Sequence, residues 1–211
     1  MKKPVKNLPE SVKARLTNLA RSTGRPFNEV LRYYAIERFL YRLAQSKYAH
    51  TFVLKGGLIF YARQLHLARP TRDIDLQAYA SSLLSDVDLI FREICSQPVE
   101  ADGMRFDQAS VKSERIMANA VLQGVGVKCW SYLGAAEIQV QIDVSYANVI
   151  TPGDITIAYP TLLASPEPRL RAYPYETVIA EKLQALVFLG RINDRLKDFL
   201  RSLAAVAANH F

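Results

Sequence analysis

Helix-type spacing of apolar residues marks both ends of this chain. Apolar positions recur every three to four residues over 10–23 and again over 28–45, and this spacing predicts two N-terminal helices. Gly24 suits the end of the first helix, and Asn28 is a favourable N-cap for the second. The same spacing predicts further helices at 58–66, 83–95, 175–189 and 193–208.

Strict alternation of polar and apolar residues predicts strands in the middle of the chain. Residues 73–78 alternate in this way, and so do 125–129 and 138–144. Gly134 lies between the last two segments and suits a hairpin turn. A short β-rich run at 51–54 predicts one more strand. Helices, then strands mixed with helices, then helices favour an α+β core with helical flanks.

Two segments predict no regular element. Residues 98–115 are polar and lack a clear period, and residues 151–174 contain five prolines. Because proline cannot donate a backbone hydrogen bond, we interpret 151–174 as a linker or a loop that wraps between lobes. We therefore expect a first domain at 1–160, which includes a basic helical segment at 1–48, and a helical C-terminal lobe at 161–211.

Composition excludes several classes of protein. Half of the 211 residues are hydrophobic and 22% are charged, which is incompatible with a disordered chain. No apolar run reaches the roughly 18 residues of a membrane-spanning helix. The basic N-terminus is followed by no apolar stretch, so we expect no secretory signal, no membrane partner and a cytoplasmic location. Cys95 and Cys129 stand alone, which excludes a disulfide framework and a thiolate zinc site.

The net charge of +7 is unevenly distributed. Residues 1–72 contain 15 basic and three acidic residues, a net +12, whereas residues 73–211 carry a net charge of −5. Such a gradient indicates a basic surface for a polyanion and an acidic centre elsewhere, although a solvated basic helix face would give the same composition. The candidate contacts with such a polyanion are basic side chains of the N-terminal helices: Lys13, Arg15, Arg21, Arg25, Arg32, Arg38 and Arg42.

Asp73 and Asp75 are the central chemical feature. Residues two apart in a strand point to the same face, so these carboxylates would project together. Close carboxylates repel, and a divalent cation such as Mg²⁺ relieves that repulsion. The alternative is a pair of acids on an exposed edge strand. Asp143 ends the polar row of its own strand, and three carboxylates converge if that strand lies beside Asp73; otherwise it is a solvent-facing acid.

A second feature is the run Lys55-Gly56-Gly57, at the end of a strand and before a helix. Glycines at such a turn let the backbone approach a phosphate, and the N-terminus of a helix favours anions. The alternative is a two-glycine turn required for steric reasons alone.

Lys182 interrupts an apolar helical stripe. A buried lysine needs an anionic partner or a lowered pKa, whereas a lysine that extends along the surface toward solvent needs neither. Asp198 lies beside the apolar stripe of the last predicted helix, and Arg195 could simply pair with it on the helix surface.

Together these motifs resemble the AbiEii family of nucleotidyltransferase toxins, which includes the MenT-type enzymes. The resemblance rests on KGG, TRDIDL, VQIDVSY, ETVIAEK and KDF in this order, and extends from about residue 11 to residue 200. It implies a polymerase-beta-like nucleotidyltransferase fold, with a small mixed sheet between N-terminal and C-terminal helices. It also implies transfer of a nucleotide from an NTP, with Mg²⁺, onto RNA and in particular onto tRNA ends. We further expect an antitoxin partner and a monomer.

The resemblance also implies roles for individual residues. Asp73 and Asp75 would hold the metal, with Asp143 as a third carboxylate, and Lys182 and Asp198 would be the essential lysine and acid of the later motifs. The triphosphate would be bound by Gly56 and Gly57 and by cations: Lys55, Arg72 and Lys182.

The chain departs from the family in three places. Leu58 follows Gly57 where many relatives carry a hydroxyl, and Phe199-Leu200 replaces a common Tyr-Asp-Leu. The chain also stops soon after KDF, so we expect a shortened or truncated acceptor-binding half. Two alternatives stay open: an enzyme that acts on a protein or small-molecule hydroxyl, and an inactive module that binds RNA or a partner.

Overall fold

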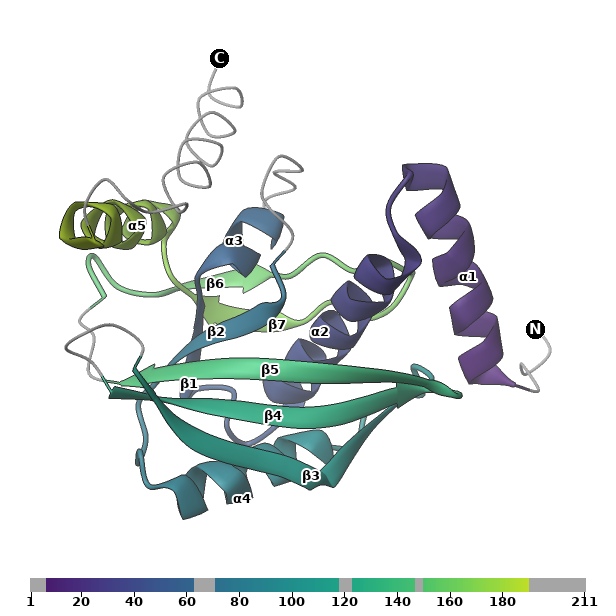
Figure 1. Cartoon of the computed structure of the whole chain (residues 1–211), viewed down its shortest axis with the longest axis horizontal. Coiled ribbons are helices and arrows are strands. Elements are labelled where there is room, and N and C mark those ends of the chain that lie inside the picture. Colours follow the sequence, from purple (N-terminus) through teal and green to yellow (C-terminus); the bar gives the residue numbers. More distant parts are fainter. Residues whose placement is uncertain (1–6, 63–70, 118–122, 147–149, 190–211) are drawn as a thin grey trace.

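A computed structural model describes residues 7–62, 71–117, 123–146 and 150–189 (Figure 1). The helices of this part are α1 (Leu8–Thr23), α2 (Phe27–Gln45), α3 (Gly57–Ala62), α4 (Leu84–Cys95) and α5 (Tyr175–Leu189). The strands are β1 (Phe52–Lys55), β2 (Asp73–Ala78), β3 (Met104–Met117), β4 (Gln123–Leu133), β5 (Ala136–Tyr146), β6 (Ile155–Ala158) and β7 (Arg169–Ala172). Among these residues no helix is both long enough and apolar enough to cross a bilayer.

The strands form one seven-stranded sheet in the order β3-β4-β5-β2-β1-β7-β6. β2 and β5 run parallel, as do β1 and β7, whereas the other neighbours are antiparallel. β3, β4 and β5 form a long curved ribbon, with α4 against β3 (Figure 1). The expected α+β architecture with a mixed sheet and flanking helices is confirmed.

The N-terminal helices begin and end close to their predicted positions. The Asn7 side chain accepts a hydrogen bond from the backbone N–H of Glu10 and caps α1. Gly24 ends α1 in the left-handed conformation, with φ +66°, as its position predicted. The prediction for Asn28 is wrong: Pro26 is the N-cap of α2 and the helix starts at Phe27, because proline presets the φ that this position needs.

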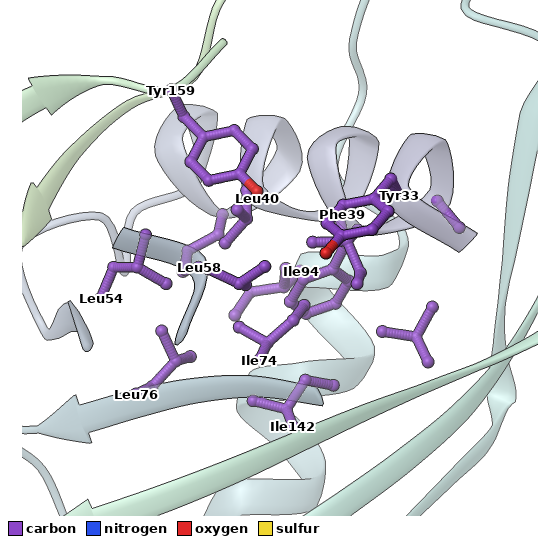
Figure 2. Packing of buried hydrophobic residues seen from close by; sticks show 14 of the residues in the cluster. Tyr33, Phe39, Leu40, Leu54, Leu58, Ile74, Leu76, Ile94, Ile142 and Tyr159 are labelled. Atoms are coloured by element: carbon purple, nitrogen blue, oxygen red, sulfur yellow. The ribbon is translucent and has the colours of Figure 1, made fainter. Parts of the chain in front are cut away.

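α2 is the centre of the hydrophobic core. From Val30 to Leu43 every side chain except that of Arg32 is buried. Phe39 stacks on Phe91 of α4, with ring centroids 6.2 Å apart, and both lie on the same face of the sheet. Figure 2 shows the core-facing residues of β2 and β5 beneath α2. Each large apolar side chain buried here contributes about 1.5–3 kcal/mol.

Two predicted irregular segments are strands. β3 occupies most of 98–115; its pairing shifts register between Asp107 and Lys112, and this irregularity interrupts the alternation that would have marked it. β6 and β7 lie inside the Pro-rich segment, where two strands of four residues each fit between the prolines, and β6 is the edge strand. The sheet therefore includes strands on both sides of residue 160. The helix predicted at 193–208 lies outside the described residues.

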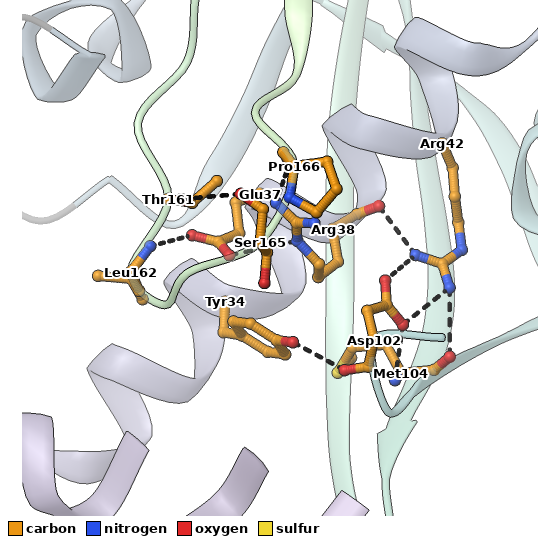
Figure 3. A network of polar contacts seen from close by, with 10 residues as sticks. All are labelled: Tyr34, Glu37, Arg38, Arg42, Asp102, Met104, Thr161, Leu162, Ser165 and Pro166. Carbon is orange, nitrogen blue, oxygen red and sulfur yellow. Dashed lines mark hydrogen bonds and ion pairs between the residues drawn. The ribbon is translucent and has the colours of Figure 1, made fainter. Parts of the chain in front are cut away.

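Arg38 and Arg42 belong to a buried polar network (Figure 3). Arg42 donates hydrogen bonds to both Asp102 oxygens, at 2.7 and 3.1 Å, and Arg38 donates to the Pro166 carbonyl oxygen at 3.0 Å. Glu37 accepts a hydrogen bond from the Leu162 N–H at 2.7 Å, so α2 fixes the segment before β7. The prediction that Arg38 and Arg42 contact RNA is wrong, because both guanidinium groups are enclosed by the protein.

Candidate active site

The parallel pairing of β2 with β5 brings the three predicted carboxylates together. Asp75 lies directly opposite Asp143, and Asp73 lies opposite Gln141. Ile74 alternates with the two aspartates and is fully buried, so Asp73 and Asp75 project from the face of the sheet opposite the core.

Crowding and burial oppose ionisation of these carboxylates. Burial raises the pKa of Asp75 to about 6, the negative charge of Asp143 adds to the effect, and Lys55 opposes it. The pKa of Asp73 is also raised, first by burial and then by Asp143, while the cations Arg32 and Arg72 act in the opposite direction.

The two glycines of KGG make room for this cluster. Gly56 has a φ of +72°, and a Cβ atom placed on it would lie 2.0 Å from Oδ2 of Asp75. A Cβ on Gly57 would lie 2.4 Å from Oγ1 of Thr71. The backbone N–H of Gly57 donates a hydrogen bond to Asp75 and favours its charged form. The geometry therefore requires glycine at position 56, a Cβ at position 57 would displace the Thr71 hydroxyl, and contact with a triphosphate stays a prediction.

Lys55 lies on the sheet face of the carboxylates, whereas Lys182 contacts α3. Lys55 lies opposite Asp75 in the register of β1 with β2, and its Nζ is 3.2 Å from Oε2 of Glu181 on α5. Lys182 is half-buried, with Nζ 4.6 Å from the ring centroid of Phe60 on α3. Glu181 was not predicted, although it is the residue next to Lys182 in the AEK motif.

A pocket of about 390 Å³ adjoins Asp73. Arg32 of α2 and Arg72 line it together with Gln139 and Gln141 of β5. Asp73 and Glu137 also line it, so the pocket is mixed in charge, and neither arginine forms an ion pair with another described residue.

The remaining residues predicted for the site are on α1, between α1 and α2, or outside the described residues. Arg15 and Arg21 are exposed on α1 and Lys13 is half-buried there. Arg25 pairs with Glu29 at 2.8 Å. Asp198 lies outside the described residues. No group of three or more His, Cys, Asp or Glu within the described ranges is arranged to hold a metal ion by itself.

Comparison with known proteins agrees with the motifs. Residues 38–200 match the family described as nucleotidyl transferase AbiEii toxin, type IV TA system. The chain belongs to this family. The match spans every predicted member of the AbiEii-type catalytic set, from Asp73 to Asp198, and confirms the resemblance. A comparison with curated proteins gave no match.

Two solved structures are similar to this chain at low sequence identity. The crystal structure of JHP933 from Helicobacter pylori is similar with a TM-score of 0.50 and 14% identity, over 81% of this chain and 62% of that one. A candidate nucleotidyltransferase from H. pylori has a TM-score of 0.47 and 15% identity, over 80% of this chain and 64% of that one. The chain thus spans less than two thirds of the length of either structure. The likeness to JHP933 shows a shared fold.

Proposed function

We propose that this chain is a Mg²⁺-dependent nucleotidyltransferase that moves a nucleotide from an NTP onto RNA, with a tRNA 3′ end as the acceptor. One observation carries the proposal: Asp75 lies opposite Asp143 and two residues from Asp73, with Lys55 on the neighbouring strand. Carboxylates beside cations on one sheet face suit a reaction between two polyanionic substrates.

The residues present fit a divalent cation. Mg²⁺ is usually held by one or two carboxylates together with substrate phosphates, so it does not need three preassembled protein ligands. Asp73 and Asp75 would supply these carboxylates, with Asp143 beside them. The raised pKa of Asp75 reflects burial and like charge, and both penalties on the charged form would fall when a cation binds. When bound, the metal would lower the pKa of the acceptor hydroxyl and neutralise the leaving pyrophosphate.

The chain's own residues would position the reactants for an in-line displacement. The acceptor oxygen would form a bond to the α-phosphorus while the bond to the pyrophosphate oxygen breaks. Asp143 or Asp198 would accept the hydroxyl proton. Lys55 and Lys182 would lie along the triphosphate, where their charge offsets the charge that develops on the leaving group.

The basic N-terminal helices support a polyanionic acceptor. Arg15, Arg21 and Lys13 lie along α1 and give it a cationic surface. Phosphate contacts of this kind position a nucleic acid without reading its sequence. Because toxins of type IV systems act with an antitoxin, we also propose a cognate antitoxin protein as a partner and the cytoplasm as the site of action.

Incubation with total RNA and each labelled NTP in turn tests the proposal. We expect label in RNA with at least one NTP in the presence of Mg²⁺, and none after chelation. Asp73→Asn and Lys182→Met should lose the transfer, whereas the exposed control variant Glu167→Gln should retain it. Label in protein or in a small molecule instead of RNA would favour the alternative acceptors. Salt-dependent RNA binding without turnover of any NTP would indicate an inactive binding module.

A further inference from the structure

The outer face of β4 carries two aromatic side chains that the core does not use. Val125, Val127, Cys129, Ser131 and Leu133 are buried, so the side chains of Lys128, Trp130 and Tyr132, which alternate with them, face outward. Trp130, the only tryptophan of the chain, is 40% exposed, and Tyr132 is half-exposed beside it. Two neighbouring aromatic rings exposed on one strand form a patch, and exposed apolar patches are typical of binding surfaces.

This aromatic pair lies on the same sheet face as the carboxylates. Directly opposed residues of neighbouring strands share a face, and Gly126 of β4 lies opposite Asp143. Continuing along β4, Lys128 lies opposite Gln141, and Trp130 lies opposite Gln139. Each two-residue step advances about 7 Å, so the face leads from the carboxylates to the aromatic rings within about two steps.

The same face carries cations between and beside the rings. The Arg105 guanidinium lies 4.1 Å from the ring centroid of Tyr132, and Lys112 lies opposite Lys128. Acidic side chains are interleaved: Glu114 pairs with Lys128 at 2.7 Å, and Asp107 lies opposite Trp130. The face is therefore mixed in charge, and its distinguishing feature is the exposed aromatic pair.

The Arg32–Arg72 pocket joins this face to the carboxylates. Gln139, which lies opposite Trp130, and Gln141 form one wall of that pocket, and Asp73 forms another part of it. An anion in the pocket would thus lie between the carboxylates and the aromatic pair.

We infer that the outer face of β3, β4 and β5 is a stacking surface for an unpaired RNA segment that ends at the carboxylates. Bases would stack on Trp130 and Tyr132, and a backbone phosphate would bind between Arg32 and Arg72. Aromatic rings beside cations are the usual means of holding a single strand, because every base presents a flat face. The inference rests on the proposed function and specifies the acceptor: it has an unpaired 3′ segment.

Continuity with the site favours RNA over a partner protein as the occupant. Trp130 lies opposite Gln139, Gln139 and Gln141 line the Arg32–Arg72 pocket, and Asp73 lines it too, so a polyanion bound along these residues would end at Asp73. We therefore expect the antitoxin to bind elsewhere on the protein, so that RNA can still reach this face.

Intrinsic fluorescence offers a direct test, because Trp130 is the only tryptophan. Titration of the full chain with a short single-stranded RNA, without NTP, should quench the emission in a saturable manner. A blunt-ended duplex of the same length should quench much less, since its bases are already stacked. Binding of single-stranded RNA without quenching, or no binding, would overturn the inference.

Variants of Trp130 measure how much its ring contributes to the affinity for single-stranded RNA. Trp130→Ala and Trp130→Leu should weaken binding of dye-labelled single-stranded RNA about 10-fold, within a range of about 5- to 150-fold for one stacked base. Trp130→Phe should stay within a few fold of the parent, because it keeps a flat aromatic face. Tyr79→Ala, which removes a 53% exposed ring just after the C-terminal end of β2, is the control and should not change RNA binding.

The two KM values distinguish a role of Trp130 in RNA binding from a role in NTP binding. In the transfer assay Trp130→Ala should raise KM for RNA and leave KM for NTP unchanged. Unchanged RNA affinity in Trp130→Ala, or loss only of antitoxin binding, would overturn the inference. Quenching by RNA without transfer of any NTP would support this surface and contradict the proposed activity, so the two failures are distinguishable.

Discussion

Replacing Asp75 by Asn should stabilise the metal-free protein at neutral pH. The pKa of Asp75 is raised from an ordinary value of 3.8 to about 6, first by burial and then by Asp143, so the folded protein disfavours the charged form. At about 1.4 kcal/mol per pKa unit, that rise corresponds to at most about 3 kcal/mol of lost stability above pH 6. Asn has nearly the same shape, so it fits beside Gly56 and still accepts the Gly57 N–H.

The sign of the pH dependence follows from linkage. Below about pH 4 the carboxyl is protonated in both the folded and the unfolded chain and has no cost. Between about pH 4 and pH 6 the folded chain binds more protons than the unfolded chain, so wild-type stability falls as pH rises. The difference in free energy of unfolding between Asp75→Asn and wild type should therefore grow across this window and stay constant above it.

Urea unfolding of both proteins in EDTA, from pH 4 to pH 8, measures that difference. Asp154→Asn is a control for which we expect the opposite change in the free energy of unfolding. Arg171 donates two hydrogen bonds to Asp154 and lowers its pKa, so the charged form is favoured there. That variant should be less stable than wild type at neutral pH. Addition of Mg²⁺ should stabilise wild type and reduce the advantage of Asp75→Asn. An Asp75→Asn protein that is less stable than wild type at pH 7 would refute the reasoning.

Two further predictions concern stability. Gly56→Ala should unfold at a lower urea concentration than wild type and lose transfer, because its Cβ would meet the Asp75 carboxylate. The control Gly24→Ala has a similar φ and nothing within 4 Å of the added Cβ, so its free energy of unfolding should fall by only about 1 kcal/mol. Asp102→Ala should cost about 3–5 kcal/mol by thermal or urea unfolding, because it leaves the Arg42 charge buried without its partner; a change below 1 kcal/mol would contradict the buried pairing.

Local patterns predicted most elements and the main chemistry of the site. Alternation placed Asp73 and Asp75 on one face of a strand, and the same alternation placed Asp143 on the polar side of another. Whether the two strands are neighbours depends on sheet order, because 57 residues, including β3 and β4, lie between Ala78 at the end of β2 and Ala136 at the start of β5. Local periodicity does not contain that information.

The wrong predictions also arise from contacts between residues that are distant in the sequence. Arginines spaced four apart on a helix are typical of an exposed face, yet Arg38 and Arg42 are buried because Asp102 and the Pro166 carbonyl, both distant in sequence, satisfy them. Glu181 was missed because its partner Lys55 is on β1, far from it in the chain. Buried polar groups with long-range partners are thus invisible to a pattern that reads only neighbouring residues.

The fate of the label in an NTP tests the proposed reaction most directly. With RNA and Mg²⁺, label at the α-phosphate should enter RNA, while label at the γ-phosphate should be released as pyrophosphate. Asp73→Asn should reduce the incorporation by about 10³-fold or more, and Glu167→Gln should not. Label from the γ-phosphate in RNA, or an Asp73→Asn protein with the wild-type rate, would contradict nucleotidyl transfer at these carboxylates.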